Sequence, residues 1–288
     1  MYQVNDSSRP RRQWAVAALV LVLSAAPAMA VINGEVDTQN RHPNVGCFVI
    51  VSLNDQPIQP FVFGSLTLIA PRVVLTAGHI TLVPEELIAA GLTKATDARV
   101  SFGTDPFDPS TWHQVTDFMT HPSFTLDYGY GGNGDDVGIA ILAGPVEGIE
   151  PATLAPVGYL DDLVRGGLLR RGGNDAQVTV VGYGDGLLFP PPREPLQSEL
   201  RRFAQAAIAS ISDKWLSVLQ SPGGDGGGIN FGDSGGAAFL ADPEDGGLVL
   251  VGVPSWVGNA SIGTGHLARV DLPAVREFLD LVLEAAAD

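Results

Sequence analysis

The stretch FGDSGG, residues 231–236, places an aspartate and a serine between glycines. A glycine-rich hairpin turn would explain the glycines, because glycine adopts backbone conformations that other residues avoid. It would not explain the acid Asp233. A serine hydroxyl is a weak nucleophile that becomes reactive only beside a base. The meaning of Ser234 therefore depends on the bases and acids that the rest of the chain supplies.

Short apolar runs separated by Gly, Pro, Asn and Asp dominate the chain on both sides of this stretch. Many short strands with turn residues between them predict an all-β sandwich or barrel. QSELRRFAQAA (197–207) and PEELIAAGL (84–92) are expected to form brief helices within loops. The strand-like runs are CFVIVSL (47–53), SLTLIA (65–70), RVVLTA (72–77), VGIAIL (137–142), QVTVVGYG (177–184) and LVLVGVPSW (248–256).

Helical periodicity is clear only near the C-terminus, at about residues 271–286. Val275, Phe278, Leu279 and Val282 recur at steps of three and four residues, and Pro273 suits a first helical turn. The Pro- and Gly-rich stretch 144–173 is the expected boundary between two β units, at about residues 31–150 and 151–270.

Residues 1–30 have the pattern of a secretory signal peptide. Arg9, Arg11 and Arg12 precede the apolar run WAVAALVLVL (14–23), and AMA ends at Ala30. The Arg11–Arg12 pair also allows twin-arginine export, although a basic leader is the simpler reading. We therefore expect a mature chain of residues 31–288 that is secreted, either extracellular or periplasmic.

Composition narrows the classes of protein further. The chain has 288 residues, 45% of them hydrophobic, and a formal net charge of −16, which disfavours nucleic acid and anionic membranes as partners. No stretch after the leader is apolar for long enough to span a bilayer, so a soluble mature chain is expected. Cys47 is the single cysteine, so no disulfide can form within the chain.

A histidine follows an apolar strand in VVLTAGHI (73–80), and two acids precede another in DDVGIAIL (135–142). A lone histidine after a strand is usually a structural residue, so its meaning depends on its neighbours. Together with FGDSGG, these stretches resemble the trypsin/chymotrypsin-like serine protease family. Further matches follow in the family's order at VINGE (31–35), THPSF (120–124), VVGYG (180–184) and PSWVG (254–258).

The resemblance covers nearly all of residues 31–288 and implies two six-stranded antiparallel β-barrels, with the C-terminal helix added. It implies a serine endopeptidase that works through an acyl-enzyme intermediate and needs no cofactor. In the matching positions, Ser234 is the nucleophile, His79 the general base and then acid, and Asp136 the carboxylate that orients the histidine. Asp135 competes for that last role, but the family pattern places its acid directly before the pair matched by residues 137–138.

The resemblance also implies how the turn around the serine is built. The N–H groups of Gly232 and Ser234 would form the oxyanion hole. Asp233 would pair with the free α-amino group of Val31, which signal cleavage after Ala30 would expose. Ser255 matches the serine that supports the catalytic acid.

The residues of the specificity pocket match the family less directly than the triad does. Trp256 either borders the strand that binds the substrate backbone or belongs to the core, and both readings stay open. Gly228 matches the pocket floor and bears no charge, and Val257 and Gly265 match the residues at its mouth. Cleavage after small or medium aliphatic residues is therefore expected.

Two other side chains could change that specificity. Asp225 lies close to Gly228 in the sequence and would select Arg or Lys if it reached the floor, whereas His266 would favour acidic residues. Gly78 and Ile80 depart from the family, which usually has alanine and a bridging cysteine there. Phe63 or Gly64 stands near the position of the second cysteine.

Two rival functions remain. GDSGG also fits the G-x-S-x-G elbow of α/β-hydrolase esterases, but that fold needs an acid and then a histidine after the serine, and only His266 follows. A catalytically inactive, protease-like binding protein is the other alternative. We expect polypeptide substrates, with a protein inhibitor as a second class of partner, a monomeric state, and no metal, since the acidic runs at 105–108 and 242–245 read as solvated turns.

Overall fold

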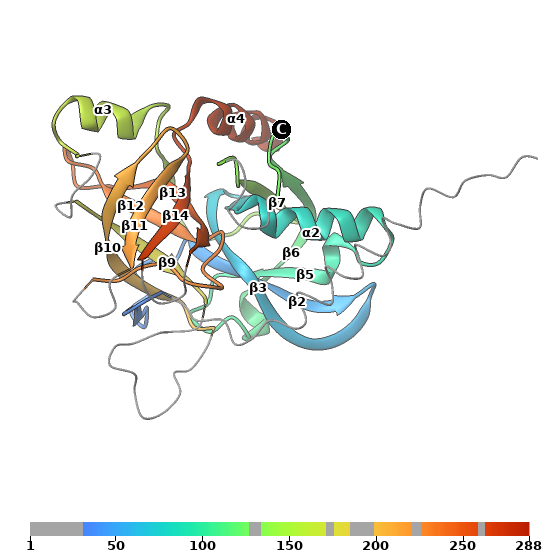
Figure 1. Cartoon of the computed structure of the whole chain (residues 1–288). Helices are drawn as coiled ribbons and strands as arrows, with labels where there is room; N and C mark the ends of the chain where they lie inside the picture. Colours follow the sequence, from blue (N-terminus) through green and yellow to red (C-terminus); the bar gives the residue numbers. More distant parts are fainter. Residues whose placement is uncertain are drawn as a thin grey trace, which may run out of the picture.

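The computed structural model describes residues 31–126, 134–170, 176–184, 199–220, 226–258 and 263–287. The strands form two closed barrels side by side, each of six antiparallel strands, which confirms the predicted fold class (Figure 1). The predicted signal peptide, residues 1–30, lies outside the described part of the chain. No helix within the described ranges is both long and apolar enough to cross a membrane.

The first barrel closes in the strand order β2-β3-β4-β7-β6-β5. Its interior is filled by apolar residues such as Leu68, Val74 and Ala140, which lie opposite one another on the same face of the sheet and are fully buried. Short 3₁₀ turns at Ala95–Asp97 and Pro109–Thr111 connect some of the strands. The strands are β2 (Val45–Leu53), β3 (Gln56–Ala70), β4 (Val73–Thr76), β5 (Ala98–Ser101), β6 (Trp112–Thr120) and β7 (Gly138–Leu142).

The second barrel closes in the order β9-β10-β11-β14-β13-β12, because β10 and β12 both pair with β9. Two short strands extend this barrel: β1 (Glu35–Val36) pairs with β10, and β8 (Thr153–Leu154) runs parallel to β13. The barrel strands are β9 (Gln177–Gly182), β10 (Arg202–Ile211), β11 (Trp215–Gln220), β12 (Ala237–Ala241), β13 (Leu248–Val257) and β14 (Gly263–Arg269).

Strand β10 corrects the expectation of a helix within residues 197–207. Alanine-rich sequence favours a helix in isolation, but residues 202–207 pair one to one with β9. Pairing with neighbouring strands inside a closed barrel outweighs local propensity here. The correction matters because it puts the side chain of Arg202 inside the second barrel, where it is 5% exposed.

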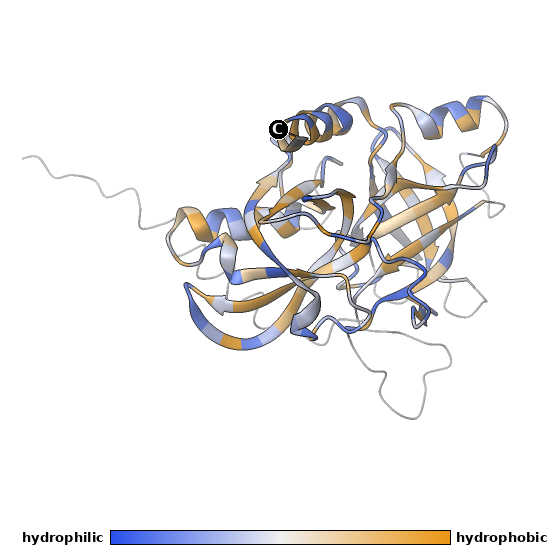
Figure 2. Cartoon of the chain, turned by 180° about the vertical axis from the view of Figure 1, so that it is seen from behind, coloured by the Kyte–Doolittle hydropathy of each residue, from blue (hydrophilic) through white to orange (hydrophobic). Residues whose placement is uncertain are grey.

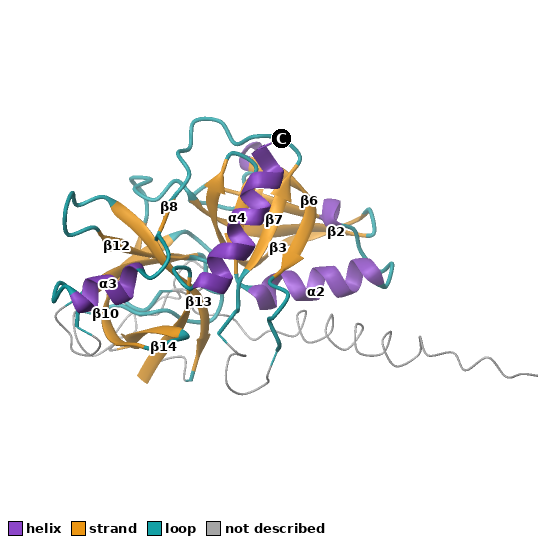
Figure 3. Ribbon diagram, turned by 90° about the horizontal axis from the view of Figure 1, so that it is seen from above, coloured by secondary structure: helices purple, strands orange, loops and turns teal. Residues whose placement is uncertain are grey.

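In the described part of the chain, three α-helices lie outside the barrels: α2 (Gly78–Ala89), α3 (Tyr159–Arg165) and α4 (Pro273–Ala287). The predicted C-terminal helix is α4, which buries Val275, Leu279 and Val282. Its Phe278 ring meets His121 at 5.1 Å, just beyond β6, and in Figure 3 it runs close to β7. The last helix therefore contacts the first barrel as well as the chain that leads out of the second.

Two fully buried arginines in the fold are paired with buried carboxylates, which offsets the cost of removing their charges from water. Arg201 is fully buried, and its Nε donates to Asp37 at 2.9 Å. Arg269 is also buried and pairs with Asp271 at 2.8 Å. Figure 2 shows that the barrel strands are largely hydrophobic, whereas hydrophilic residues gather in turns and on the outer faces of helices.

Candidate active site

Strand pairing in the first barrel brings His79 and Asp136 together. Thr76, the last residue of β4, lies opposite Gly138, the first residue of β7. His79 follows β4 in the first turn of α2, and Asp136 directly precedes β7. The Nδ1 atom of His79 lies 2.8 Å from Oδ2 of Asp136, and the backbone N–H of His79 donates to Oδ1 at 2.8 Å.

Asp136 is held by a third donor from the second barrel. The hydroxyl of Ser255 donates a short hydrogen bond to Oδ2 of Asp136, whose side chain is 2% exposed. Both carboxylate oxygens therefore accept hydrogen bonds: Oδ1 from the backbone of His79, and Oδ2 from the His79 ring and from Ser255. This fixes the carboxylate and, through it, the orientation of the His79 ring.

The two groups shift each other's ionisation. Burial alone would lower the pKa of His79, but the charge of Asp136 and the hydrogen bond to it raise that pKa above its usual value. Burial would raise the pKa of Asp136, but His79 and the hydrogen bonds from His79 and Ser255 lower it. An ionised Asp136 therefore keeps the Nδ1 proton of His79 in place and leaves Nε2 to act as a base.

Ser234 lies in a tight turn between β11 and β12 that the first barrel supports. Ser65, in β3, donates its N–H to the carbonyl of Ser234 at 2.8 Å and its hydroxyl to the carbonyl of Gly232 at 3.1 Å. Gly235 adopts a φ of +84°, and a Cβ on it would lie 2.0 Å from the hydroxyl of Thr76. A glycine is required there both by the backbone conformation and by the close approach of the first barrel.

The same turn leaves two N–H groups available. Its hydrogen bonds use the N–H groups of Asp233, Gly235 and Gly236. Among the described contacts of the turn, the N–H groups of Gly232 and Ser234 make no hydrogen bond. Two neighbouring backbone donors without an internal acceptor are what a developing oxyanion needs.

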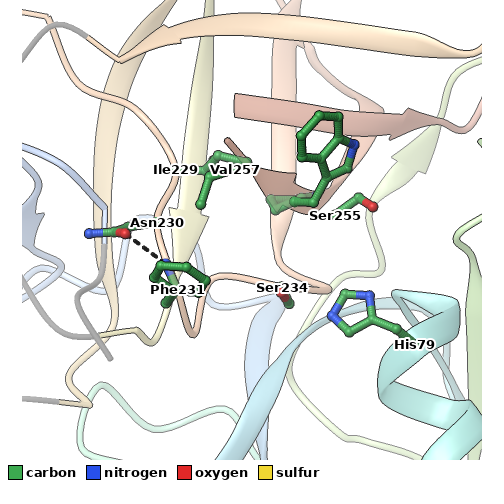
Figure 4. A pocket seen from close by; sticks show the side chains of 9 residues that line it. His79, Ile229, Asn230, Phe231, Ser234, Ser255 and Val257 are labelled. Atoms are coloured by element: carbon green, nitrogen blue, oxygen red, sulfur yellow. Dashed lines mark hydrogen bonds between the residues drawn. The ribbon is translucent and has the colours of Figure 1, made fainter. Parts of the chain in front are cut away.

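A cavity of about 190 Å³ lies between the barrels and reaches both His79 and Ser234. Figure 4 shows the His79 ring on one side of Ser234 and Phe231 on the other; Ile229 and Val257 also line the cavity. Of the residues predicted for substrate binding, Ser255, Trp256 and Val257 line it, whereas Gly228 and Gly265 do not. The complete lining is His79, Ile229, Asn230, Phe231, Ser234, Pro254, Ser255, Trp256 and Val257.

Ile229 takes the space beside Gly265. A Cβ on Gly265 would lie 2.4 Å from Cγ1 of Ile229, so the isoleucine packs directly on that glycine. Gln220 donates to the carbonyl of Ile229 at 2.6 Å and fixes its backbone. Ile229 was not predicted from the sequence as a pocket residue. Its only signal is its place next to Gly228, which the resemblance matches to the pocket floor.

His266 is turned away from the cavity. Its ring stacks on Trp256 at a centroid distance of 4.1 Å, and its Nδ1 lies 2.9 Å from the hydroxyl of Ser217. Burial lowers its pKa. His266 therefore packs against Trp256, which lines the cavity, and helps to hold that ring in place. Asp225, the other side chain considered for specificity, lies outside the described residues.

The first described residues, Val31 and Ile32, pack against the segment that leads to Ser234. Val31 and Ile32 are fully buried, and the N–H of Ile32 donates to the carbonyl of Gly228 at 2.9 Å. Asp233 is 1% exposed and accepts hydrogen bonds from the N–H groups of Asn230, at 2.9 Å, and Gly184, at 3.3 Å.

The position of the family's missing disulfide is filled by packing. A Cβ on Gly64 would lie 2.8 Å from Cδ1 of Ile80, and Ile80 is 6% exposed. The side chain of Ile80, the residue after His79, thus fills the space where a side chain at position 64 would lie. Between the two candidates near the partner position, the structure selects Gly64 over Phe63.

Comparison with known proteins gives the family. The family model for trypsin matches residues 32–276. No curated protein matches the chain. Two antiparallel β-barrels, a serine in a glycine turn and a match over most of the chain together define a trypsin-like serine protease. The chain belongs to the trypsin family, whose members act on polypeptides.

Proposed function

We propose that the chain is an active, secreted serine endopeptidase with Ser234, His79 and Asp136 as its catalytic triad. The observation that carries the proposal is the bond of His79 Nδ1 to a buried Asp136 at 2.8 Å, with His79 and Ser234 lining one cavity. Asp136 sets the tautomer in which Nε2 of His79 faces the serine as a base.

In the proposed reaction, Nε2 of His79 takes the proton of Ser234 as its oxygen attacks the carbonyl carbon of the substrate. The carbonyl oxygen becomes negatively charged and accepts hydrogen bonds from the N–H groups of Gly232 and Ser234. His79 then gives the proton to the leaving amine, and an ester on Ser234 remains. Water activated by His79 hydrolyses that ester and restores the enzyme.

The cavity supports a preference for small or medium apolar residues before the cleaved bond. Apart from His79, the described residues that line it have no titratable side chain, which favours an uncharged substrate residue. The branched side chains of Ile229 and Val257 narrow the cavity, and a substrate side chain bound there would make apolar contacts with them. A mismatch of one methylene in such a pocket changes selectivity by about 1 to 3 kcal/mol.

Secretion is proposed from the leader-like residues 1–30, and the burial of Val31 and Ile32 is consistent with a mature chain that begins at Val31. Purification of the exported protein and mass spectrometry of its first residue test this directly. A mature chain that begins elsewhere would contradict it.

Covalent labelling tests the proposed chemistry. A fluorophosphonate reacts with a serine only when its base and oxyanion donors are in place, so the exported protein should be labelled on Ser234. Ser234→Ala is the matched control and should remain unlabelled with an unchanged melting temperature. Absence of labelling in the wild type would instead favour a protease-like binding protein.

A further inference from the structure

Arg202 is a buried cation that the proposed mechanism does not use. It lies in β10, where its side chain is enclosed in the second barrel and 5% exposed. A guanidinium in such a place needs a carboxylate, because an unpaired buried charge is costly. The neighbouring Arg201 points to the opposite face and is matched with Asp37.

Strand pairing places Arg202 and Asp233 on one face of the sheet. Arg202 lies directly opposite Gly182 of β9, and residues opposite each other project to the same side with Cβ atoms about 5 Å apart. A Cβ on Gly182 would lie 2.3 Å from Oδ1 of Asp233. The Asp233 carboxylate thus occupies the place of the missing side chain, on the face of the sheet from which Arg202 projects, and its charge acts on the guanidinium.

Arg202 also contacts the start of the chain. Its Nη1 donates to the carbonyl of Gly34 at 3.1 Å, and a Cβ on Gly34 would lie 2.8 Å from Cγ1 of Val31. The guanidinium therefore lies between the N-terminal segment and the turn that carries the serine. Burial lowers the pKa of Arg202, and the charge of Asp233 opposes that shift.

We propose that Arg202 is a positioning residue whose guanidinium is a permanent counter-charge for Asp233 and holds the 230–234 turn in its active form. The turn then depends on the free amine of Val31 only in part. The inference rests on the proposed function, because that turn provides the oxyanion donors. It predicts an enzyme that keeps its active turn when the amine is uncharged or absent.

Alkaline pH separates the charge of Arg202 from that of the Val31 amine, because the described side chains next to the guanidinium do not titrate there. Among the described residues, Asp233 is the charged group that acts on Arg202. β9 presents Gly182, β1 presents Val36 and the chain start presents Val31, none of which has a titratable side chain. An α-amino group has an ordinary pKa of about 8, whereas a guanidinium stays charged above pH 12.

The first experiment compares the exported full chain with its Arg202→Met and Arg202→Lys variants. From pH 8 to 10.5, wild-type kcat/KM should change by less than about threefold, while Arg202→Met should lose about tenfold or more as the Val31 amine deprotonates. Arg202→Lys should follow the wild type until its own ammonium deprotonates near pH 10.4. If Arg202→Met fails to fold, the Arg202→Lys variant still tests the inference. An Arg202→Lys enzyme whose kcat/KM does not fall above about pH 10.4 would overturn it.

The second experiment uses the full chain produced without export, so that residues 1–30 remain and Val31 has no free amine. Wild-type protein should react with the fluorophosphonate within about tenfold of the mature rate, and Arg202→Met about 100-fold more slowly. Equal labelling of the two uncleaved forms would overturn the inference. No labelling of any form, mature wild type included, would instead refute the proposed function.

Thermal unfolding tests the Arg202–Asp233 pair without any activity. In the uncleaved full chain, where Val31 has no free amine, Arg202→Met should melt about 10 °C below the wild type at pH 8, because Asp233 loses the counter-charge of the guanidinium. That carboxylate would have a raised pKa, so it protonates as the pH falls and the deficit should shrink toward pH 4. A deficit that is equal at both pH values would mean that Arg202 acts only through packing, and the pair would be refuted.

Discussion

Replacement of Ile229 by alanine should widen the substrate pocket and change which residue the enzyme prefers. The isoleucine packs on Gly265 and lines the cavity, so the substitution removes three methylene-sized groups from the pocket wall. At about 0.8 kcal/mol for each buried group, a larger substrate side chain would gain about 2.4 kcal/mol, or about 60-fold in relative kcat/KM. The preference should therefore move from alanine and valine toward leucine and phenylalanine.

The assay measures kcat/KM for peptides that differ only in the residue before the cleaved bond. Ile229 is 2% exposed, so its loss also lowers the stability of the fold, by about 2 to 5 kcal/mol. Ile211→Ala is the matched control, because Ile211 is buried in the same barrel but does not line the cavity. If the ratio of phenylalanine to alanine cleavage is the same in both variants, Ile229 does not limit the pocket.

Four further predictions have distinct readouts. Ser234→Ala or His79→Ala should lower peptide hydrolysis by about 10⁴-fold or more while the protein still folds, and near-normal turnover in either would refute the triad. The pKa of His79 is raised above 6.5, and the base must be neutral, so kcat/KM should fall about tenfold per pH unit below that pKa; a flat profile down to pH 5 would contradict this. Ser65→Ala removes the hydroxyl bond to the turn and should lower kcat by about tenfold with little change in KM, which steady-state kinetics will show. Gly64→Ala should lower stability by about 1 to 3 kcal/mol through its contact with Ile80, and Ile80→Val should restore part of it in denaturant titrations.

The sequence predicts the fold well because its signals are local. Apolar runs such as 72–77 and 137–142 became β4 and β7, and their turns are marked by Gly, Pro, Asn and Asp. The helix at the C-terminus has a clear repeat of three and four residues. Residues 202–207 mislead for the opposite reason, since alanine is a helix former and the pairing with β9 is a long-range effect.

The sequence motifs also indicate which side chains meet, but not how the space between them is filled. His79, Asp136 and Ser234 stand in recognisable stretches, and strand pairing explains the contact of the first two. Ser65 and Ile229 have no such signal. A polar residue within a strand and an isoleucine beside a glycine look ordinary until the barrels are packed together, because their roles depend on contacts made across more than a hundred residues or across a sheet.

The contact of Ser65 with the turn around Ser234 has a consequence for the order of folding. His79 and Ser234 belong to different barrels, and the serine turn takes two of its hydrogen bonds from a strand of the first barrel. A chain in which only one barrel has formed lacks those bonds and so lacks the oxyanion donors in their reactive arrangement. Under the proposed function, peptide hydrolysis therefore requires both barrels to be folded and docked, and a chain with one barrel formed is expected to be inactive.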